Sequence, residues 1–178
     1  GDCALTEFTF GTIAGPLPLP AGAYDLAIRQ ANADNPCSED PLLTAPGVML
    51  DDGVTYSIVA HLTADGDPTA SVFVNDVNPT APGKARLSVH HTAAAPAVDI
   101  TVKRGGPKSP GVVIEDFVNG DQAEAEVRPG EWKVSIAPAG SEDAVFGPAL
   151  IELEPFTVYL VFAVGALDDG SFTLLIEP

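Results

Sequence analysis

Three histidines are the side chains of this sequence best suited to acid–base or metal chemistry at neutral pH. They are His61, His90 and His91. In an extended strand His90 and His91 would point to opposite faces, so we do not expect them to share a metal or to act as an acid–base pair. A hydrogen bond between one of them and Asp99 across a hairpin stays open, and it would be an ordinary structural arrangement. The Gly-x-Ser-x-Gly motif of serine hydrolases is absent from the sequence.

Pairs of adjacent carboxylates are the second set of candidates, and each pair lies at an expected turn or strand end. The pairs are Glu39-Asp40, Asp51-Asp52, Glu115-Asp116, Glu142-Asp143 and Asp168-Asp169. A glycosidase needs two carboxylates that face each other across a cleft, which sequence spacing does not indicate. The fragment Asp65-Gly66-Asp67 falls short of a calcium loop and predicts a hairpin tip. We therefore expect no catalytic residue, no cofactor and no metal site, while weak calcium binding by oxygens from separate loops stays open.

The glycine-rich and aromatic segments predict structure before chemistry. The stretch Arg104-Gly105-Gly106-Pro107-Lys108 has neither a preceding buried parallel strand nor a following helix, so it is no phosphate loop. We expect a basic, mobile hairpin tip there. Tyr24, Tyr56, Trp132 and Tyr159 fall on alternating strand positions. That pattern favours packing in a core, and the alternative is a platform on which carbohydrate stacks.

Composition excludes two classes of partner and favours short strands. The chain has 25 acidic and 8 basic residues, a formal charge of −17, which would repel nucleic acid and an anionic membrane surface. Hydrophobic residues make up 46 % of the chain, enough for a buried core. No uninterrupted apolar stretch approaches the roughly 20 residues of a membrane helix. The 17 glycines and 17 prolines are typical of many strands joined by turns.

The two cysteines indicate an oxidising compartment. Cys3 and Cys37 lie on either side of the first long strand region, among Asp, Asn, Ser and Pro. We predict that they form a disulfide, with two free thiols as the alternative. The chain starts at Gly1 without a leader, which a removed signal or a fragment would each explain. We expect a secreted, extracellular or cell-surface protein.

A repeated order of signals divides the chain into two modules. The segment 78–83 lacks a hydrophobic period and is rich in turn residues, so it predicts a linker between modules 1–79 and 80–178. Each module has a Pro/Gly turn, an alternating strand, a second strand, an Asp-Gly turn and a final strand. The matching pieces are 19–28 and 128–136, 54–60 and 156–163, and 65–74 and 169–176. The sequence therefore predicts an all-β fold of two tandem immunoglobulin-like antiparallel β-sandwich modules.

The second module begins with two strands that the first module does not have. Residues 84–90 and 97–103 both alternate apolar and polar side chains, and the small residues 92–96 between them predict a turn. We expect these two strands to form a hairpin. The first module is thus predicted to lack about two N-terminal strands, which leaves a sheet edge incomplete.

The start of the second module also resembles a known family. Residues 85–102, A-R-L-S-V-H-H-T-A-A-A-P-A-V-D-I-T-V, resemble the opening of the bacterial and archaeal domain-of-unknown-function family 4397. Phe10–Ile13 and Pro20–Tyr24 resemble later parts of the family pattern in the first module, and Pro129–Trp132 does so in the second. Thr92-Ala93-Ala94 departs from the family's usual proline after the histidine. The resemblance implies secreted or surface β-sandwich modules, often in tandem, with no established chemistry.

Charge is distributed unevenly between the modules. Residues 1–79 contain 11 acidic residues and one basic residue, a net charge of −10, whereas residues 80–178 contain 14 and seven. Five basic residues cluster around the front strands of the second module: Lys84, Arg86, Lys103, Arg104 and Lys108. An acidic neighbour would be attracted to them. Together with Phe8, Phe10 and Ile13 at the incomplete edge, they form the candidate assembly interface.

These observations predict a non-enzymatic extracellular structural protein. We expect a building block of a surface layer, stalk or filament that associates with neighbouring subunits through β-strand contacts. The alternative is an extracellular carbohydrate- or protein-binding adhesion module that uses loops at one end of a sandwich. A hydrolase with two facing carboxylates is a third interpretation. The incomplete edge would be covered by a neighbour, by a separated N-terminal piece, or by local rearrangement within a monomer.

Overall fold

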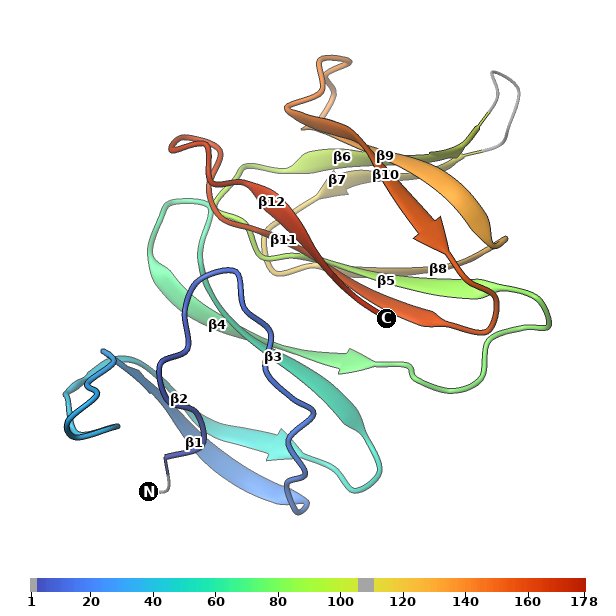
Figure 1. The fold of residues 1–178 in the computed structure, drawn as a ribbon. Helices are drawn as coiled ribbons and strands as arrows, with labels where there is room; N and C mark the ends of the chain where they lie inside the picture. The colour runs from blue at the N-terminus through green and yellow to red at the C-terminus, as the bar shows by residue number, and fades with distance from the viewer. Residues whose placement is uncertain (1–2, 106–110) are drawn as a thin grey trace. The chain divides into compact units, whose positions relative to one another are not determined.

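The computed structural model describes residues 3–105 and 111–178, and the described chain is all-β, as predicted. The strands are β1 (Gly22–Arg29), β2 (Pro41–Leu50), β3 (Thr55–Leu62), β4 (Pro68–Asn75), β5 (Ala85–His91), β6 (Val98–Arg104), β7 (Val112–Phe117), β8 (Gln122–Val127), β9 (Gly130–Pro138), β10 (Phe146–Leu153), β11 (Val158–Val164) and β12 (Thr173–Glu177) (Figure 1). They divide into two compact units. Unit 1 is Gly1–Ala60 with Pro68–Asn75, and unit 2 is His61–Asp67 with Asp76–Pro178.

Unit 2 is a β-sandwich of two four-stranded sheets. The strand orders are β10-β9-β6-β7 and β12-β11-β5-β8. Each sheet turns its alternate apolar residues inward, and the resulting core contains residues of both sheets. Trp132, Val134 and Ile136 of β9 are only 5 %, 5 % and 0 % exposed, so the alternation predicted for this strand is confirmed.

Each sheet has two inner strands, and one of them is β6 in the first sheet and β5 in the second. β5 lies between β11 and β8, and β6 lies between β9 and β7. β5 runs parallel to β11 and antiparallel to β8, so the unit is not purely antiparallel as the sequence predicted. A parallel pair is possible here because β5 and β11 are far apart in sequence and no tight turn joins them. Removing β5 and β6 would leave two strand pairs, β9–β10 and β11–β12, without their inner neighbours.

The predicted hairpin between β5 and β6 is wrong, because the two strands belong to opposite sheets. Their connection first follows the end of β11, with hydrogen bonds from Thr92 N to Ala163 O (2.9 Å) and from Ala94 N to Gly165 O (2.7 Å). It then crosses to the other sheet over the buried Ala93 and Ala95. The apolar alternation of both strands is satisfied equally by a hairpin and by two facing sheets, so it does not distinguish them.

Unit 1 consists of two two-stranded sheets, β1–β2 and β3–β4, and β2 contacts β4. Among its described residues only two large apolar side chains are buried, Leu50 (8 % exposed) and Phe73 (5 % exposed). Residues 3–21 precede β1 and contain no strand. Unit 1 therefore has strand pairs like those of unit 2 but a far smaller core.

The corresponding strand pairs of the two units share their register. Gly22 pairs with Leu50 and Tyr24 with Val48 in unit 1, and Gly130 pairs with Leu153 and Trp132 with Ile151 in unit 2. Tyr24 Oη donates to Pro20 O (2.7 Å), and Trp132 Nε1 donates to Arg128 O (2.9 Å), each four residues back. The hydroxyl of Tyr56 accepts from Asp51 N (3.1 Å), and that of Tyr159 accepts from Glu154 N (2.9 Å), each five residues back. Equivalent residues thus make equivalent contacts in both units.

Replacing Trp132 with alanine should lower the free energy of unfolding of unit 2 by about 3–5 kcal/mol, because a large buried side chain is deleted from the core. Urea unfolding followed by far-UV circular dichroism would measure this change. The control is Phe156→Ala, since Phe156 is 68 % exposed and its loss should change stability by less than about 0.5 kcal/mol. Equal effects of the two substitutions would contradict the assigned core.

Candidate functional site

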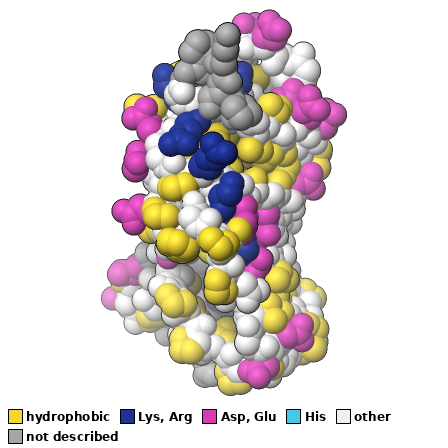
Figure 2. Space-filling view, turned by 90° about the vertical axis from the view of Figure 1, so that its right-hand side faces the viewer, with side chains coloured by type: hydrophobic (Ala, Val, Ile, Leu, Met, Phe, Trp, Pro, Cys, Tyr) yellow, Lys and Arg dark blue, Asp and Glu magenta, His cyan; other side chains and the backbone are white. Residues whose placement is uncertain are grey.

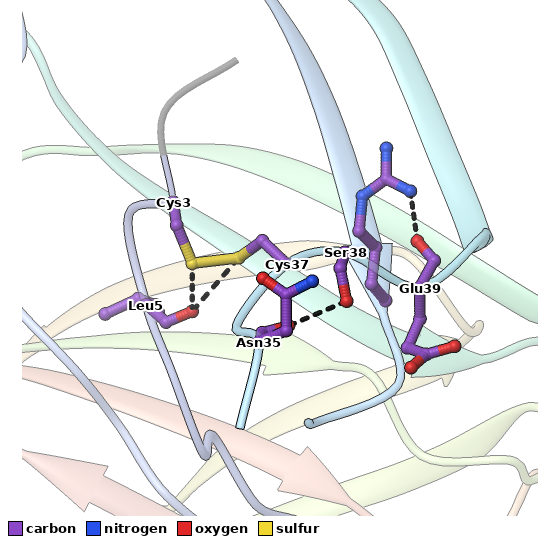
Figure 3. The surroundings of a disulfide bond; sticks show 7 residues. Cys3, Leu5, Asn35, Cys37, Ser38 and Glu39 are labelled. Atoms are coloured by element: carbon purple, nitrogen blue, oxygen red, sulfur yellow. Dashed lines mark hydrogen bonds between the residues drawn. A yellow bond between two sulfur atoms is a disulfide. The ribbon is translucent and has the colours of Figure 1, made fainter. Parts of the chain in front are cut away.

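The predicted disulfide is present and anchors the segment that precedes β1. Cys3 and Cys37 are bonded, with 5.8 Å between their Cα atoms. Both sulfur atoms lie beside the carbonyl of Leu5, at 3.7 and 4.0 Å (Figure 3). Cys37 lies in the connection between β1 and β2, where Ser38 Oγ donates to Asn35 O at 2.7 Å. The disulfide therefore ties the start of the chain to the end of the β1–β2 pair.

Residues 3–21, which we call the arm, carry the apolar part of the predicted assembly interface. Every residue of the arm is exposed. Its large apolar side chains include Phe8 (53 % exposed), Phe10 (68 %) and Ile13 (46 %). The backbone of the arm makes one backbone–backbone hydrogen bond within the described chain, from Thr12 N to Thr9 O. The expected sheet edge beside Phe8–Ile13 is wrong in its detail, because this segment belongs to no sheet.

Each strand of unit 1 has one open edge, because in the described part of the chain β1 pairs with β2 alone and β3 with β4 alone. The open edges of β1 and β3 are the ones whose equivalents in unit 2 are paired. The equivalent strand β9 pairs on its other side with β6, from Val98 opposite Pro138 to Arg104 opposite Trp132. In unit 2, β7 pairs only with β6, and β8 pairs only with β5. The described part of unit 1 has no strands equivalent to β5 and β6. A segment in the place of β7 or β8 therefore has no strand to pair with, which explains why the arm is irregular.

Two equivalent glycines show the difference between the occupied and the open edge. A methyl group on Gly130 would lie 3.1 Å from Nη2 of Arg104, which belongs to the neighbouring strand β6. A methyl group on Gly22 would meet no atom within 4 Å. Both glycines have positive φ angles, 115° and 155°. The position beside β9 that the Arg104 side chain occupies is therefore empty beside β1.

The basic part of the predicted interface lies in unit 2. Lys103 lies directly opposite Lys133 in the β6–β9 pair, and Figure 2 shows Lys and Arg side chains gathered on one face. Lys103 and Arg104 are exposed, and Lys84 is half-buried. Lys108 lies outside the described residues. This clustering gives unit 2 a basic surface although the chain as a whole is acidic.

Arg86 differs from the other basic candidates because it is engaged inside unit 2. It is 8 % exposed and lies 3.0 Å from both Asp76 Oδ2 and Glu126 Oε1. Its Nη1 also donates to the carbonyls of Asp76 (2.8 Å) and Asn78 (3.0 Å). A buried guanidinium with this many partners fixes the segment before β5 and contributes no free charge to a surface.

The histidines of β5 are buried side chains with different neighbours. His90 stacks on Phe162, with 4.5 Å between ring centroids, and its Nδ1 lies 3.3 Å from Val161 O. His91 lies against Phe117 and its Nε2 is 3.4 Å from Pro96 O. Both are 0 % exposed, so neither ring can reach a dissolved substrate. These contacts agree with the opposite orientations expected along a strand.

Burial decides the protonation of these rings. It lowers the pKa of His90 from 6.5 to about 4, although the hydrogen bond with Val161 raises the pKa. Burial also lowers the pKa of His91, opposed by the Pro96 carbonyl and by the charge of Asp121. Both rings are therefore neutral at pH 7. They serve as packing groups in a strand that is buried along its whole length.

The pairing of a histidine with Asp99, which the sequence left open, does not form. Asp99 Oδ1 accepts from Asp116 N (2.9 Å), and Oδ2 accepts from Gly140 N (2.8 Å). These two hydrogen bonds lower the pKa of Asp99 and tie β6 to β7 and to the β9–β10 turn. Because β6 lies in the sheet opposite β5, its outward carboxylate cannot face a β5 histidine.

An open groove of about 530 Å³ lies on the outer face of the β10-β9-β6-β7 sheet. Its polar lining includes Lys103, Lys133, Asp99, Thr101, Ser135 and Glu142. No aromatic ring is among the described residues that line it, so the groove lacks a stacking platform for a sugar ring. Sequence analysis missed this groove, because its residues come from separate strands and only the sheet order brings them together.

The described residues contain no group of three or more His, Cys, Asp or Glu side chains that could hold a metal ion. In the same part of the chain, no helix has the length and apolarity of a membrane span.

Comparison with known proteins gives one match. The family model described as a domain of unknown function, DUF4397, matches residues 1–101. The chain belongs to the DUF4397 family. The matched range contains β1 to β5 and most of β6, so the DUF4397 model groups the two central strands of unit 2 with the strands of unit 1. Neither the curated proteins nor the solved structures contain a significant match.

The free energy of unfolding should fall as the pH is lowered from about 7 towards 4. The unfolded state binds more protons than the folded state in this window, because His90 has a pKa of about 4 when folded and 6.5 when unfolded. We expect the wild-type protein to lose on the order of 2–3 kcal/mol more than His90→Phe over this range. Urea unfolding at a series of pH values would measure both proteins. Parallel pH profiles would show that His90 is not buried in its neutral form.

Mass spectrometry after alkylation tests the disulfide. Without reductant neither Cys3 nor Cys37 should be alkylated, and with reductant both should be. The Cys3→Ser/Cys37→Ser variant should lose about 3–4 kcal/mol of stability in the chain-entropy model, since the bond closes a loop with a sequence separation of 34. Two alkylated thiols in the unreduced protein would refute the bond.

Proposed function

We propose that this protein is an extracellular structural building block, without enzymatic activity, that assembles into a surface layer, stalk or filament through β-strand contacts between subunits. The observation that carries the proposal is the pair of open sheet edges in unit 1, at β1 and β3. Open edges present unpaired backbone donors and acceptors, which template pairing with another chain. The matching contacts of the two units support a tandem of related sandwich modules, one with its central strands and one without.

The exposed apolar surface of unit 1 supports the same proposal. Phe8, Phe10 and Ile13 are exposed, and so are apolar residues of the sheets, including Leu42 (67 %) and Met49 (61 %). Exposed apolar patches on soluble proteins usually mark contacts with other molecules. Backbone pairing and apolar burial would therefore act together when a strand of another subunit adds to unit 1.

The disulfide and the acidic composition support the proposed location. A disulfide persists in oxidising environments such as the cell exterior. The acidic composition gives a soluble surface, because copies with a charge of −17 repel one another. A surface or secreted building block meets both conditions.

An adhesion module is the second candidate, and it rests on two observations. Phe8 and Phe10 are exposed aromatic rings that could stack on a sugar. The outer groove of unit 2 presents amine, hydroxyl and carboxylate groups that could bind polar ligands. Screening of the full chain on a glycan array, with Phe8→Asp/Phe10→Asp and Lys103→Glu/Lys133→Glu variants, would distinguish the two surfaces.

Assembly should increase with protein concentration and with salt. Every copy carries a charge of −17, so salt reduces the repulsion that opposes a contact made by backbone and apolar groups. Sedimentation velocity and electron microscopy from micromolar to submillimolar protein, at low and high salt, would measure this. A monodisperse monomer throughout this range would contradict the proposal. Assemblies that dissolve in high salt would indicate contacts through the basic surface of unit 2 instead.

A further inference from the structure

We propose that the arm of one copy pairs as an added strand with the open β1 edge of a second copy, and that the exchange is reciprocal. The inference rests on the proposed function and specifies its partner, a second copy of this chain. It also names the two surfaces, the arm around Phe8 and Phe10 and the outer edge of Gly22–Arg29. Figure 1 shows the arm as the dark blue segment that leads into β1.

The arm has the composition of a strand that lacks a sheet. Thr6, Phe8 and Phe10 alternate with Glu7 and Thr9, and threonine and phenylalanine favour strands. In an extended conformation the two phenyl rings would lie on one face. Because the arm is exposed, pairing with an edge costs it few existing contacts, mainly the hydrogen bonds from Thr12 to Thr9 O.

The β1 edge offers the complementary surface. Tyr24 and Leu26 are half-buried on one face of β1, next to the position that the added phenyl rings would take. The same edge of β9 is covered by β6 along seven paired residues, which shows that this edge geometry accepts a strand. The open position beside Gly22 leaves room for a side chain of the incoming strand.

The prolines at the end of the arm favour a second copy over the arm's own β1. Pro16, Pro18 and Pro20 occupy alternate positions shortly before the strand. Each lacks a backbone N–H and has a fixed φ, so this stretch cannot continue a regular hairpin ladder from the same β1. Cys3 and Gly22 hold the two ends of the arm. Between these two ends the arm can extend outwards as a loop. At about 3.3 Å per residue, the tip of this loop reaches roughly 30 Å.

Reciprocal exchange gives enough contact for a weak, concentration-dependent pair. A two-fold contact uses the same patch on both copies, so it buries four phenyl rings. Phe8 and Phe10 are 53 % and 68 % exposed, so only that share of the about 150–250 Å² of each ring is left to bury. The four rings then contribute about 360–600 Å², and the surfaces that receive them bury a similar area. The total of about 700–1,200 Å² lies at the lower limit of a specific interface, where weak and transient contacts are found. The β3 edges stay open in this pair and are available for further growth.

The test combines a variant with cross-linking of the full chain. Phe8→Asp/Phe10→Asp should raise the dissociation constant by about tenfold or more in sedimentation velocity. Phe156→Asp is the matched control, because Phe156 is as exposed as Phe10, at 68 %, but lies in unit 2. It should leave association unchanged. A photo-reactive amino acid at position 10, in mixed light and heavy isotope-labelled copies, should give mixed-label cross-links to Gly22–Arg29.

The results separate two questions: whether the protein assembles at all, and whether the arm makes the contact between copies. Weakened association in the arm variant together with mixed-label cross-links to β1 supports the proposal. Unchanged association of Phe8→Asp/Phe10→Asp, or mixed-label cross-links only to other strands, overturns the arm contact while the proposed assembly stands. A monomer at every concentration overturns both. Same-label cross-links alone show that the arm folds on its own subunit and overturn the exchange.

Discussion

The pairing of β5 and β6 with the strands on either side of them is the interaction on which the structure depends. Each is a central strand, and together they join strand pairs and single strands into two complete sheets. Their inward side chains, among them Leu87, Val89 and Ile100, also form a large part of the core. Main-chain hydrogen bonds and apolar burial therefore stabilise unit 2 through the same two strands.

Unit 1 shows what the same kind of strand pairs look like without central strands. The register, the tyrosine contacts and the hairpin turns are retained, so local sequence is sufficient for each pair. Burial is not retained, because a two-stranded sheet leaves both outer edges and much of each face uncovered. The DUF4397 match includes β5 and β6 together with the strands of unit 1. This grouping is consistent with a fold in which such a strand pair belongs to every complete module.

Sequence patterns predicted the local features and missed the choices between distant partners. The alternation around Trp132, the Asp-Gly turn before β12 and the disulfide were all predicted, since each depends on nearby residues or on the only two cysteines. The β5–β6 hairpin was predicted wrongly, because apolar alternation does not tell a neighbour in one sheet from a neighbour across the core. The irregular arm and the internal ion pairs of Arg86 depend on which strands are present elsewhere. No local pattern contains that information.

Amide hydrogen exchange of β1 relative to β9 tests whether the β1 edge is open. The two strands have the same register with their hairpin partners, but only β9 is paired on both edges. In dilute, monomeric protein we expect fast exchange for the amides of Gly22–Arg29 that point away from β2, and slow exchange along the whole of β9. In concentrated protein the same β1 amides should become protected. Slow exchange on both edges of β1 in the monomer would show that the edge is already covered, and would refute pairing of this edge with another subunit.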